Sequence, residues 1–329
     1  MSNSKKPVVF ISEPIADCGL EILKDACEIA APWQDSESVD EELLRSLFYE
    51  ADASITRLFP LCGEDIRRCK RLKVIARHGV GYDMVDCETA TELGIAVLNT
   101  PEANSNSVAE HTIAMLMAVA KEIGPSWKAV VSGNFWHRSK MDCVELANKT
   151  LGLIGLGRIG RRVAQIAISG LGMEVCAYDP FLDAKSYDGP VTIEEDLDKL
   201  LARSDFLSMH VPLTRESRHL LNEERLQKVK PGCRVVNTSR GGVVDESALV
   251  RALESGTVSG AALDVFETEP VPADHPLCSA PNTILTPHTA AQSREAMENM
   301  ARDSAQGVFD FLQGRRPQWV VNPEALKEH

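Results

Sequence analysis

The chain has 329 residues, which is enough for two domains of the usual size of about 100–200 residues. Its 44% hydrophobic and 25% charged residues are typical of an ordinary soluble protein, with no run near the roughly 20 apolar residues of a membrane span. The formal net charge of -13 argues against a nucleic-acid partner, because binding to phosphate backbones requires a basic face.

The start of the chain lacks a signal-peptide pattern, and the nine cysteines are scattered without a C-x-x-C pair. We therefore expect a cytoplasmic protein with reduced thiols and no membrane partner. The eight histidines do not show metal-ligand spacing, so the sequence predicts no metal site.

Runs with β-strand character alternate with helical runs over the first hundred residues. Predicted strands lie at 8–11, 28–31, 53–56, 73–76 and 96–99, and predicted helices lie near 20–26, 41–49, 64–69 and 87–93. Such alternation predicts a parallel sheet with helices on both faces. We expect residues 1–102 to form a lobe of their own.

A long apolar helix is predicted after the N-cap chemistry that begins at Asn104, and we expect Gly124-Pro125 to end it. The following arm, 127–148, carries aromatic residues with little clean periodicity. Aromatic side chains in an irregular arm usually pack on a partner subunit or another lobe. We therefore expect a homodimer formed through residues 107–150.

Residues 151–179 have the pattern of a strand, a glycine-rich turn, a helix and a second strand. Gly155, Gly157 and Gly160 form a G-x-G-x-x-G spacing, which permits a tight turn, close approach of N–H groups to a pyrophosphate, and close packing of helix on strand. Asp179 ends the second strand, where an acid accepts hydrogen bonds from a ribose 2′-OH. Because no arginine stands beside Asp179, the sequence predicts NAD and not NADP; the alternative is a similar unit without a dinucleotide.

The βα alternation then continues to the C-terminal part of the chain. Predicted strands lie at 206–209, 234–237, 260–263 and 283–285, and predicted helices lie near 197–202, 223–229, 246–254 and 293–313. Polar residues cluster just past the strand ends, which is the ligand-binding edge of an open parallel sheet. The last helix is expected to return to the first lobe.

Arg240, Glu269 and His288 follow successive strand ends. Each alone has an ordinary interpretation, as a surface ion pair, a solvated loop acid or a packed imidazole. Together, beside a nicotinamide, they supply what 2-keto acid reduction requires. The arginine binds the substrate carboxylate, the histidine protonates the carbonyl oxygen, and the glutamate holds the histidine tautomer.

Several ordered motifs resemble those of the D-isomer-specific 2-hydroxyacid dehydrogenases, most closely the phosphoglycerate dehydrogenase-like branch. The resemblance covers nearly the whole chain. The motifs are RHGVGYD at 77–83, SVAE at 107–110, the segment 145–160, HVPLT at 210–214, NTSRGG at 237–242, ALDVFETEP at 262–270 and TPH at 286–288.

This resemblance implies a Rossmann NAD-binding domain, 103–289, inserted in a flavodoxin-like substrate-binding domain made of residues 1–102 and 290–329. It implies that Arg240 binds the substrate, that His288 is the general acid/base and that Glu269 orients it. Substrate would also contact Arg57, Gly79, Val80 and Gly81. NAD would be lined by Gly155, Gly157, Arg158, Ile159, Gly160, Asp179, His210, Val211, Pro212, Thr238, Ser239, Arg240, Asp264 and His288.

The segment Thr56-Arg57-Leu58 departs from the Arg-Ser common in the family, and Met84 stands where many members have asparagine. Arg57 matches a phosphate-binding position, although pairing with Asp52 or Glu64 is an equal alternative. Our first interpretation of the substrate is 3-phosphoglycerate or another 2-hydroxy acid with a distal anion. The alternatives are a glyoxylate, hydroxypyruvate or D-lactate type of reductase and, in another class, a non-catalytic NAD(H)-sensing corepressor-like binding protein.

Overall fold

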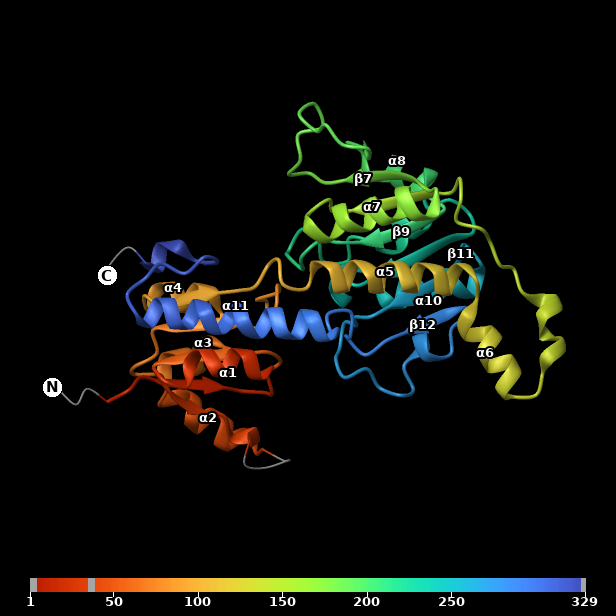
Figure 1. The fold of residues 1–329 in the computed structure, drawn as a ribbon. Coiled ribbons are helices and arrows are strands. Elements are labelled where there is room, and N and C mark those ends of the chain that lie inside the picture. The colour runs from red at the N-terminus through yellow and green to blue at the C-terminus, as the bar shows by residue number, and fades with distance from the viewer. Residues whose placement is uncertain (1–4, 35–38, 327–329) are drawn as a thin grey trace. The chain divides into compact units, whose positions relative to one another are not determined.

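The computed structural model describes residues 5–34 and 39–326, which divide into two compact units (Figure 1). Unit 1 contains the chain up to Asn104 together with the chain from Gln292 onward, and unit 2 is Ser105–Ala291. The domains expected from the sequence divide at residues 102 and 289.

Unit 1 has a five-stranded parallel sheet in the order β2-β1-β3-β4-β5, which is the flavodoxin order. Its elements are β1 (Val8–Ile11), α1 (Asp17–Leu23), β2 (Glu28–Ala30), η1 (Pro32–Gln34), α2 (Glu41–Tyr49), β3 (Ala53–Thr56), α3 (Gly63–Arg68), β4 (Val74–Arg77), α4 (Cys87–Glu92), β5 (Ala96–Leu98), α11 (Arg294–Leu312) and η5 (Pro323–Leu326).

Strands β3, β4 and β5 of unit 1 are buried along their whole length, as parallel strands covered on both faces must be. One core layer joins these strands to α1 and to Ala301, Ala305 and Val308 of α11. The last long helix therefore completes unit 1, although it follows unit 2 in the chain.

Unit 2 has a seven-stranded parallel sheet in the order β12-β11-β10-β9-β6-β7-β8, which contains the Rossmann order. Its elements are α5 (Ser105–Ala120), α6 (Ile123–Val131), η2 (Phe135–Lys140), β6 (Thr150–Ile154), α7 (Arg158–Leu171), β7 (Glu174–Tyr178), β8 (Thr192–Ile193), α8 (Leu197–Arg203), β9 (Phe206–Met209), α9 (Glu223–Leu226), β10 (Cys233–Asn237), η3 (Gly241–Val243), α10 (Glu246–Ser255), β11 (Val258–Leu263), η4 (Pro276–Cys278) and β12 (Thr283–Leu285).

These two parallel-sheet units confirm the predicted fold class. The two-residue strand β8 was not predicted, because so short a segment has no recognisable period.

Helix α5 lies beside α7 on one face of the seven-stranded sheet (Figure 1). The prediction that Gly124-Pro125 ends this helix is wrong, because α5 ends at Ala120 and both residues lie in the first turn of α6. Proline fits there because a first-turn N–H needs no partner within the helix. The arm after it is partly helical, with a 3₁₀ segment at Phe135–Lys140.

No helix in the described part of the chain is long and apolar enough to cross a membrane.

Candidate active site

The glycine-rich turn of unit 2 connects β6 to α7. Gly155 has a φ of +97°, and a Cβ on it would lie 2.6 Å from the His210 carbonyl oxygen, so only glycine fits this turn. A Cβ on Gly160 would lie 2.5 Å from the Gly155 carbonyl oxygen, whereas one on Gly157 would meet nothing within 4 Å. The turn is thus packed against other backbone atoms at Gly155 and Gly160, and it leaves space at Gly157, as a pyrophosphate site requires.

Helix α7 begins directly after this open glycine. Gly157 is its N-cap and, as a glycine, has no side chain that could cap the first-turn N–H groups. Unpaired N–H groups and the positive end of the helix dipole favour a bound anion. The residues present therefore fit the pyrophosphate of a dinucleotide.

Asp179 follows β7 and has a structural role that the sequence did not reveal. Its carboxylate accepts the Leu156 N–H at 2.9 Å and the Phe181 N–H at 3.0 Å, so it joins the glycine turn to the end of β7. A carboxylate has about four acceptor positions, and two remain for ribose hydroxyl groups. Asp179 is half-buried at this edge of the sheet.

His210, Val211 and Pro212 follow β9, and Thr238 and Ser239 follow β10, so all five lie at carboxyl ends of neighbouring strands. The His210 Nε2 lies 2.9 Å from the Ser208 hydroxyl, and burial lowers the pKa of His210 to about 4. This histidine is therefore neutral at pH 7. The Thr238 hydroxyl lies 2.7 Å from that of Thr112 on α5, and the Ser239 hydroxyl donates to Asn237 Oδ1 at 2.8 Å.

The predicted catalytic side chains come together in unit 2. The His288 Nδ1 lies 2.8 Å from the Glu269 Oε2, and both side chains are about 40% exposed, at 42% and 37%. Burial alone would raise the pKa of the Glu269 carboxyl, but hydrogen bonds from His288 and from the Phe266 N–H, with the charge of Arg240, hold this pKa below its ordinary value. Glu269 is therefore an anion that faces His288 at neutral pH.

Gly241 allows the turn that carries Arg240 to lie against the loop that carries Glu269. A Cβ on Gly241 would lie 1.9 Å from the Phe266 carbonyl carbon, so no other residue fits without moving that loop. The Arg240 carbonyl is held by the Asn237 amide at 2.8 Å, and its guanidinium donates to the Ser239 carbonyl at 2.7 Å.

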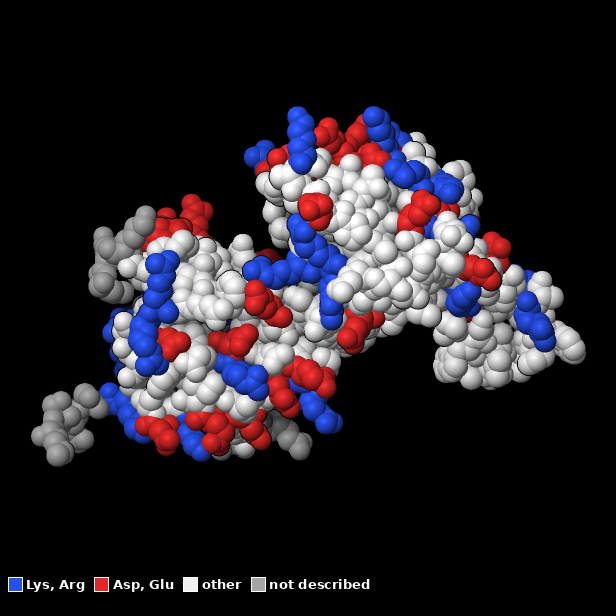
Figure 2. Space-filling view, turned by 45° about the horizontal axis from the view of Figure 1, so that its top comes forward, with Lys and Arg blue, Asp and Glu red and all other residues white. Residues whose placement is uncertain are grey.

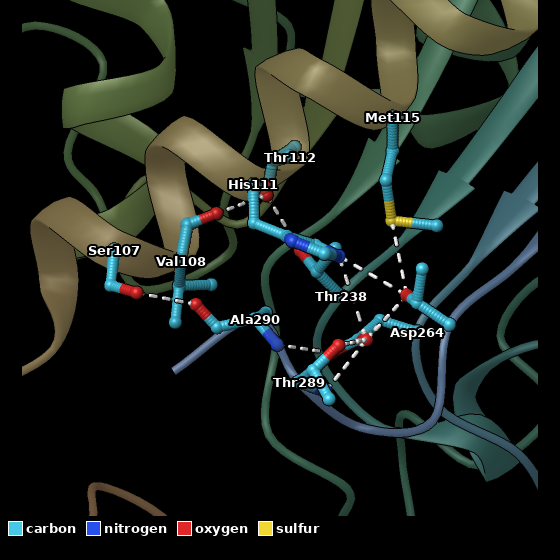
Figure 3. Close-up of polar contacts among 10 residues, drawn as sticks. Ser107, Val108, His111, Thr112, Met115, Thr238, Asp264, Thr289 and Ala290 are labelled. Carbon is cyan, nitrogen blue, oxygen red and sulfur yellow. Dashed lines mark hydrogen bonds and ion pairs between the residues drawn. The ribbon is translucent and has the colours of Figure 1, made fainter. Parts of the chain in front are cut away.

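Asp264 is completely buried directly after β11, and Figure 3 shows its contacts with Thr289 and Ala290, the two residues that follow His288. Its carboxylate accepts the Thr286 hydroxyl at 2.5 Å and the N–H groups of Thr289 and Ala290 at 2.8 and 2.9 Å. Its backbone carbonyl accepts the His288 N–H at 2.8 Å.

One aspartate therefore binds three successive N–H groups, 288 to 290. These bonds explain how His288 keeps a left-handed φ of +53°, which costs a non-glycine residue roughly 1–2 kcal/mol. The contact of Asp264 with the cofactor stays a prediction, whereas its contact with the His288 loop is a feature that sequence reasoning missed.

Helix α5 also contributes to this polar cluster (Figure 3). The His111 Nε2 lies 3.1 Å from the Thr286 hydroxyl and 3.5 Å from the Asp264 carboxylate. The Ser107 hydroxyl donates to the Ala290 carbonyl at 2.7 Å. Ser107 belongs to the SVAE motif at 107–110, but the sequence did not indicate its partner, and His111 was not singled out.

In unit 1, Arg57 follows β3 and is half-buried. The Glu13 carboxylate accepts the Arg57 N–H at 3.0 Å and the Leu58 N–H at 2.7 Å, and burial lowers the pKa of the Arg57 guanidinium against the opposing effect of Glu13. The alternative partner Asp52 is instead bound to Arg71 at 2.7 Å. The acid beside Arg57 is therefore Glu13, which the sequence did not indicate.

The loop after β4, residues 79–81, has its carbonyl groups turned toward the protein. The Gly79 carbonyl accepts the Thr100 N–H at 3.0 Å, the Val80 carbonyl accepts the Asn99 amide at 2.9 Å, and the Gly81 carbonyl accepts the Arg77 Nε at 3.1 Å. Within the described chain, no acceptor faces the N–H groups of 79–81. The loop is therefore a row of backbone donors suited to an anion.

Helix α6 and the following arm carry an exposed apolar surface, and the segment that extends from unit 2 in Figure 1 is mostly white in Figure 2. Its large side chains include Trp127, 69% exposed, and Trp136, 78% exposed. The other members are Ile123, Val130, Val131 and Phe135. A surface of this kind is typical of a protein interface.

Comparison with known proteins agrees with this geometry. A family model described as "D-isomer specific 2-hydroxyacid dehydrogenase, NAD binding domain" matches residues 113–290. A glyoxylate reductase of Thermofilum pendens is 39% identical over 98% of this chain and 96% of its own length. A D-3-phosphoglycerate dehydrogenase of Synechocystis is 39% identical over 97% of this chain but 56% of its own length.

Among solved structures, the D-lactate dehydrogenase of Aquifex aeolicus, in complex with NAD and lactic acid, is 32% identical, with a TM-score of 0.83 over 96% of this chain and 99% of that one.

Proposed function

The chain belongs to the D-isomer specific 2-hydroxyacid dehydrogenase family of NAD-dependent oxidoreductases, and from this premise we propose that it interconverts a 2-keto acid and a D-2-hydroxy acid. The observation that carries the proposal is the 2.8 Å contact between His288 and Glu269 beside Arg240, in the same unit as the dinucleotide turn. A non-catalytic NAD(H)-binding protein would not need this arrangement, and the relatives are enzymes.

The contact with Glu269 determines which ring nitrogen of His288 is left to exchange a proton with the substrate. Because the His288 Nδ1 is bound to Glu269, the Nε2 is the nitrogen left to face a substrate oxygen. NADH, when bound, supplies the hydride to the keto carbon. His288 gives its proton to the carbonyl oxygen, Glu269 stabilises the positive imidazolium before that transfer, and Arg240 binds the substrate carboxylate.

We assign the dinucleotide to the carboxyl edge of the seven-stranded sheet. Gly155, Gly157, Arg158, Ile159 and Gly160 would hold the pyrophosphate. Asp179 would accept the ribose hydroxyl groups. The residues that would line the remainder of the cofactor are His210, Val211, Pro212, Thr238, Ser239, Arg240, Asp264 and His288.

In unit 1, we assign substrate binding to the N–H groups of Gly79, Val80 and Gly81, and to Arg57. A half-buried guanidinium at a strand end supports our first substrate class, an acid with a distal anion such as 3-phosphoglycerate. Leu58 is 60% exposed next to it, and this apolar side chain supports the second class, a short keto acid such as glyoxylate, hydroxypyruvate or pyruvate.

A panel of keto acids tests the proposal. The purified protein is mixed with NADH and, in turn, glyoxylate, pyruvate, hydroxypyruvate and 3-phosphohydroxypyruvate, and NADH oxidation is followed. We expect turnover with at least one of them, and D-configuration of the product wherever that product is chiral, because glycolate, formed from glyoxylate, has no stereocentre. Binding of NADH without oxidation by any of the four would overturn the proposed reaction.

We also propose a homodimer formed through residues 107–150, supported by the exposed apolar side chains of α6 and the arm. Sedimentation of the wild type and of Trp136→Glu tests it, and a monomeric wild type would contradict it. The nine free cysteines support the expected cytoplasmic location.

A further inference from the structure

We propose that Asn99 is a positioning residue for substrate binding, because its side-chain amide holds the Val80 carbonyl and so presents the Gly81 N–H to the substrate carboxylate. The inference rests on the proposed function, in which the loop 79–81 binds that carboxylate. It adds a residue that lies between the motifs named at 77–83 and 107–110 and that acts through the loop, not by contact with the substrate.

In a planar trans peptide, the carbonyl of one residue and the N–H of the next point in opposite directions. The Asn99 Nδ2 donates to the Val80 carbonyl at 2.9 Å, so the Gly81 N–H points away from Asn99. In the same way, the Thr100 N–H fixes the Gly79 carbonyl and therefore the direction of the Val80 N–H.

Asn99 differs from the other two residues that hold this loop. Thr100 uses its backbone, and Arg77 also donates to the Thr56 carbonyl at 3.0 Å, so neither can be changed to test the loop alone. Asn99 is half-buried directly after β5, and its one side-chain hydrogen bond among the described residues is the bond to Val80.

Without the Asn99 amide, the plane of the peptide between Val80 and Gly81 can turn to other orientations, because the glycine at 81 accepts a wide range of φ and ψ angles. The carboxylate would then have to order the loop on binding, which lowers its affinity. Since the carboxylate is bound equally in the ground and transition states, the loss should raise KM and leave kcat unchanged.

The test compares Asn99→Ala and Asn99→Leu with the wild type, using the best keto acid of the panel. Asn99→Leu keeps the approximate size of the side chain, adds no charge and removes the donor. We expect KM for the keto acid and the inhibition constant of oxamate to rise about tenfold or more in both variants. We expect kcat and the NADH dissociation constant to stay within about twofold of the wild type.

Asn322→Ala is the matched control in the same unit. Asn322 is buried, accepts the Val97 N–H at 2.7 Å and donates to the Ile95 carbonyl at 3.0 Å, so it supports β5 without touching the loop. Its loss should lower the melting temperature and leave KM unchanged.

An unchanged KM in both Asn99 variants, or an equal rise in Asn322→Ala, would overturn the inference while wild-type turnover still upholds the proposed function. Absence of wild-type turnover would instead remove the proposed function itself.

Discussion

The carboxyl edges of the two parallel sheets prepare for a ligand in opposite ways. In unit 2, backbone groups and a buried aspartate hold the loops, and charged side chains extend from them: Asp264 binds three N–H groups so that His288 can project. In unit 1, the side chains of Asn99 and Arg77 and the backbone N–H of Thr100 bind the carbonyl groups of the loop, so that the N–H groups of its own backbone are left to face a ligand.

This difference suits the two sheet edges to two different roles, the chemical step and the recognition of an anion. Side chains can change protonation state and carry a proton, so unit 2 is suited to the chemical step. Backbone N–H groups cannot titrate, and a fixed row of them recognises an anion at little reorganisation cost. Changes in unit 2 should therefore act mainly on kcat, and changes in unit 1 should act mainly on the KM for the keto acid.

The largest expected effect comes from removing the proton donor of unit 2. His288→Ala should lower kcat by roughly 10²- to 10⁴-fold, the usual contribution of general acid/base catalysis, with little change in NADH affinity. Steady-state kinetics and NADH fluorescence titration measure both. His137→Ala, which changes a histidine of the arm, is the control. A kcat equal to that of the wild type would remove His288 from the mechanism.

The next effect concerns the cofactor edge of unit 2. A 2′-phosphate would meet the Asp179 carboxylate, so NADH should exceed NADPH in kcat/KM by roughly a hundredfold. Asp179→Ala should narrow this ratio, whereas Asp179→Glu should preserve it. The ratio is measured with each cofactor at a saturating keto acid concentration. Equal kcat/KM values for the two cofactors in the wild type would refute the NAD assignment.

Unit 1 is tested at Arg57. If its guanidinium binds a distal anion, Arg57→Ala should raise KM for 3-phosphohydroxypyruvate by about ten- to a hundredfold and change little for pyruvate or glyoxylate. Arg71→Ala, which loses an ion pair with Asp52 in the same unit, is the control. Equal losses on long and short keto acids would mean that Arg57 supports the fold, and the first substrate class would be withdrawn.

The smallest expected effect is on stability. His78 is 3% exposed, and burial together with the charge of Arg57 lowers its pKa from 6.5 to about 4. As pH falls below 6.5, His78 therefore takes up a proton in the unfolded chain but stays neutral in the folded chain. The free energy of unfolding falls until about pH 4, where His78 is protonated in the folded chain as well. The loss should be roughly 1 kcal/mol by pH 6.

Urea unfolding between pH 8 and pH 5 measures this loss. His78→Phe keeps a ring in the same place and cannot titrate, so its unfolding free energy should fall less steeply with pH. Identical slopes for the variant and the wild type would show that His78 does not contribute to acid sensitivity.

Features that depend on residue type and spacing alone could be predicted from the sequence. The two parallel sheets, the glycine turn and the group Arg240, Glu269 and His288 were predicted, because periodicity and side-chain chemistry are written in the residue types. The hydrogen bonds from Asn99 and Arg77 to the Val80 and Gly81 carbonyls were not predicted, because the direction of a peptide plane depends on contacts that form only on folding.

The buried network of Asp264 and the acid beside Arg57 were missed for a related reason. An aspartate at a strand end reads equally well as a ligand for a cofactor and as a support for a loop, and its three backbone partners are 24 to 26 residues away. Glu13 lies 44 residues before Arg57 and is brought to it by the pairing of β1 with β3.

The bond between the Ser107 hydroxyl and the Ala290 carbonyl joins the first turn of unit 2 to its last residues. The two ends of unit 2 are therefore close together, as in domains that can be removed from one protein and inserted into another. We expect residues 105–291 to fold when expressed alone, and a circular permutant with these ends joined by a short linker and opened at an exposed turn to fold as well. Unit 1 is built from two separate segments of the chain, whereas unit 2 is one continuous segment. A single continuous piece of coding sequence therefore encodes unit 2 but not unit 1.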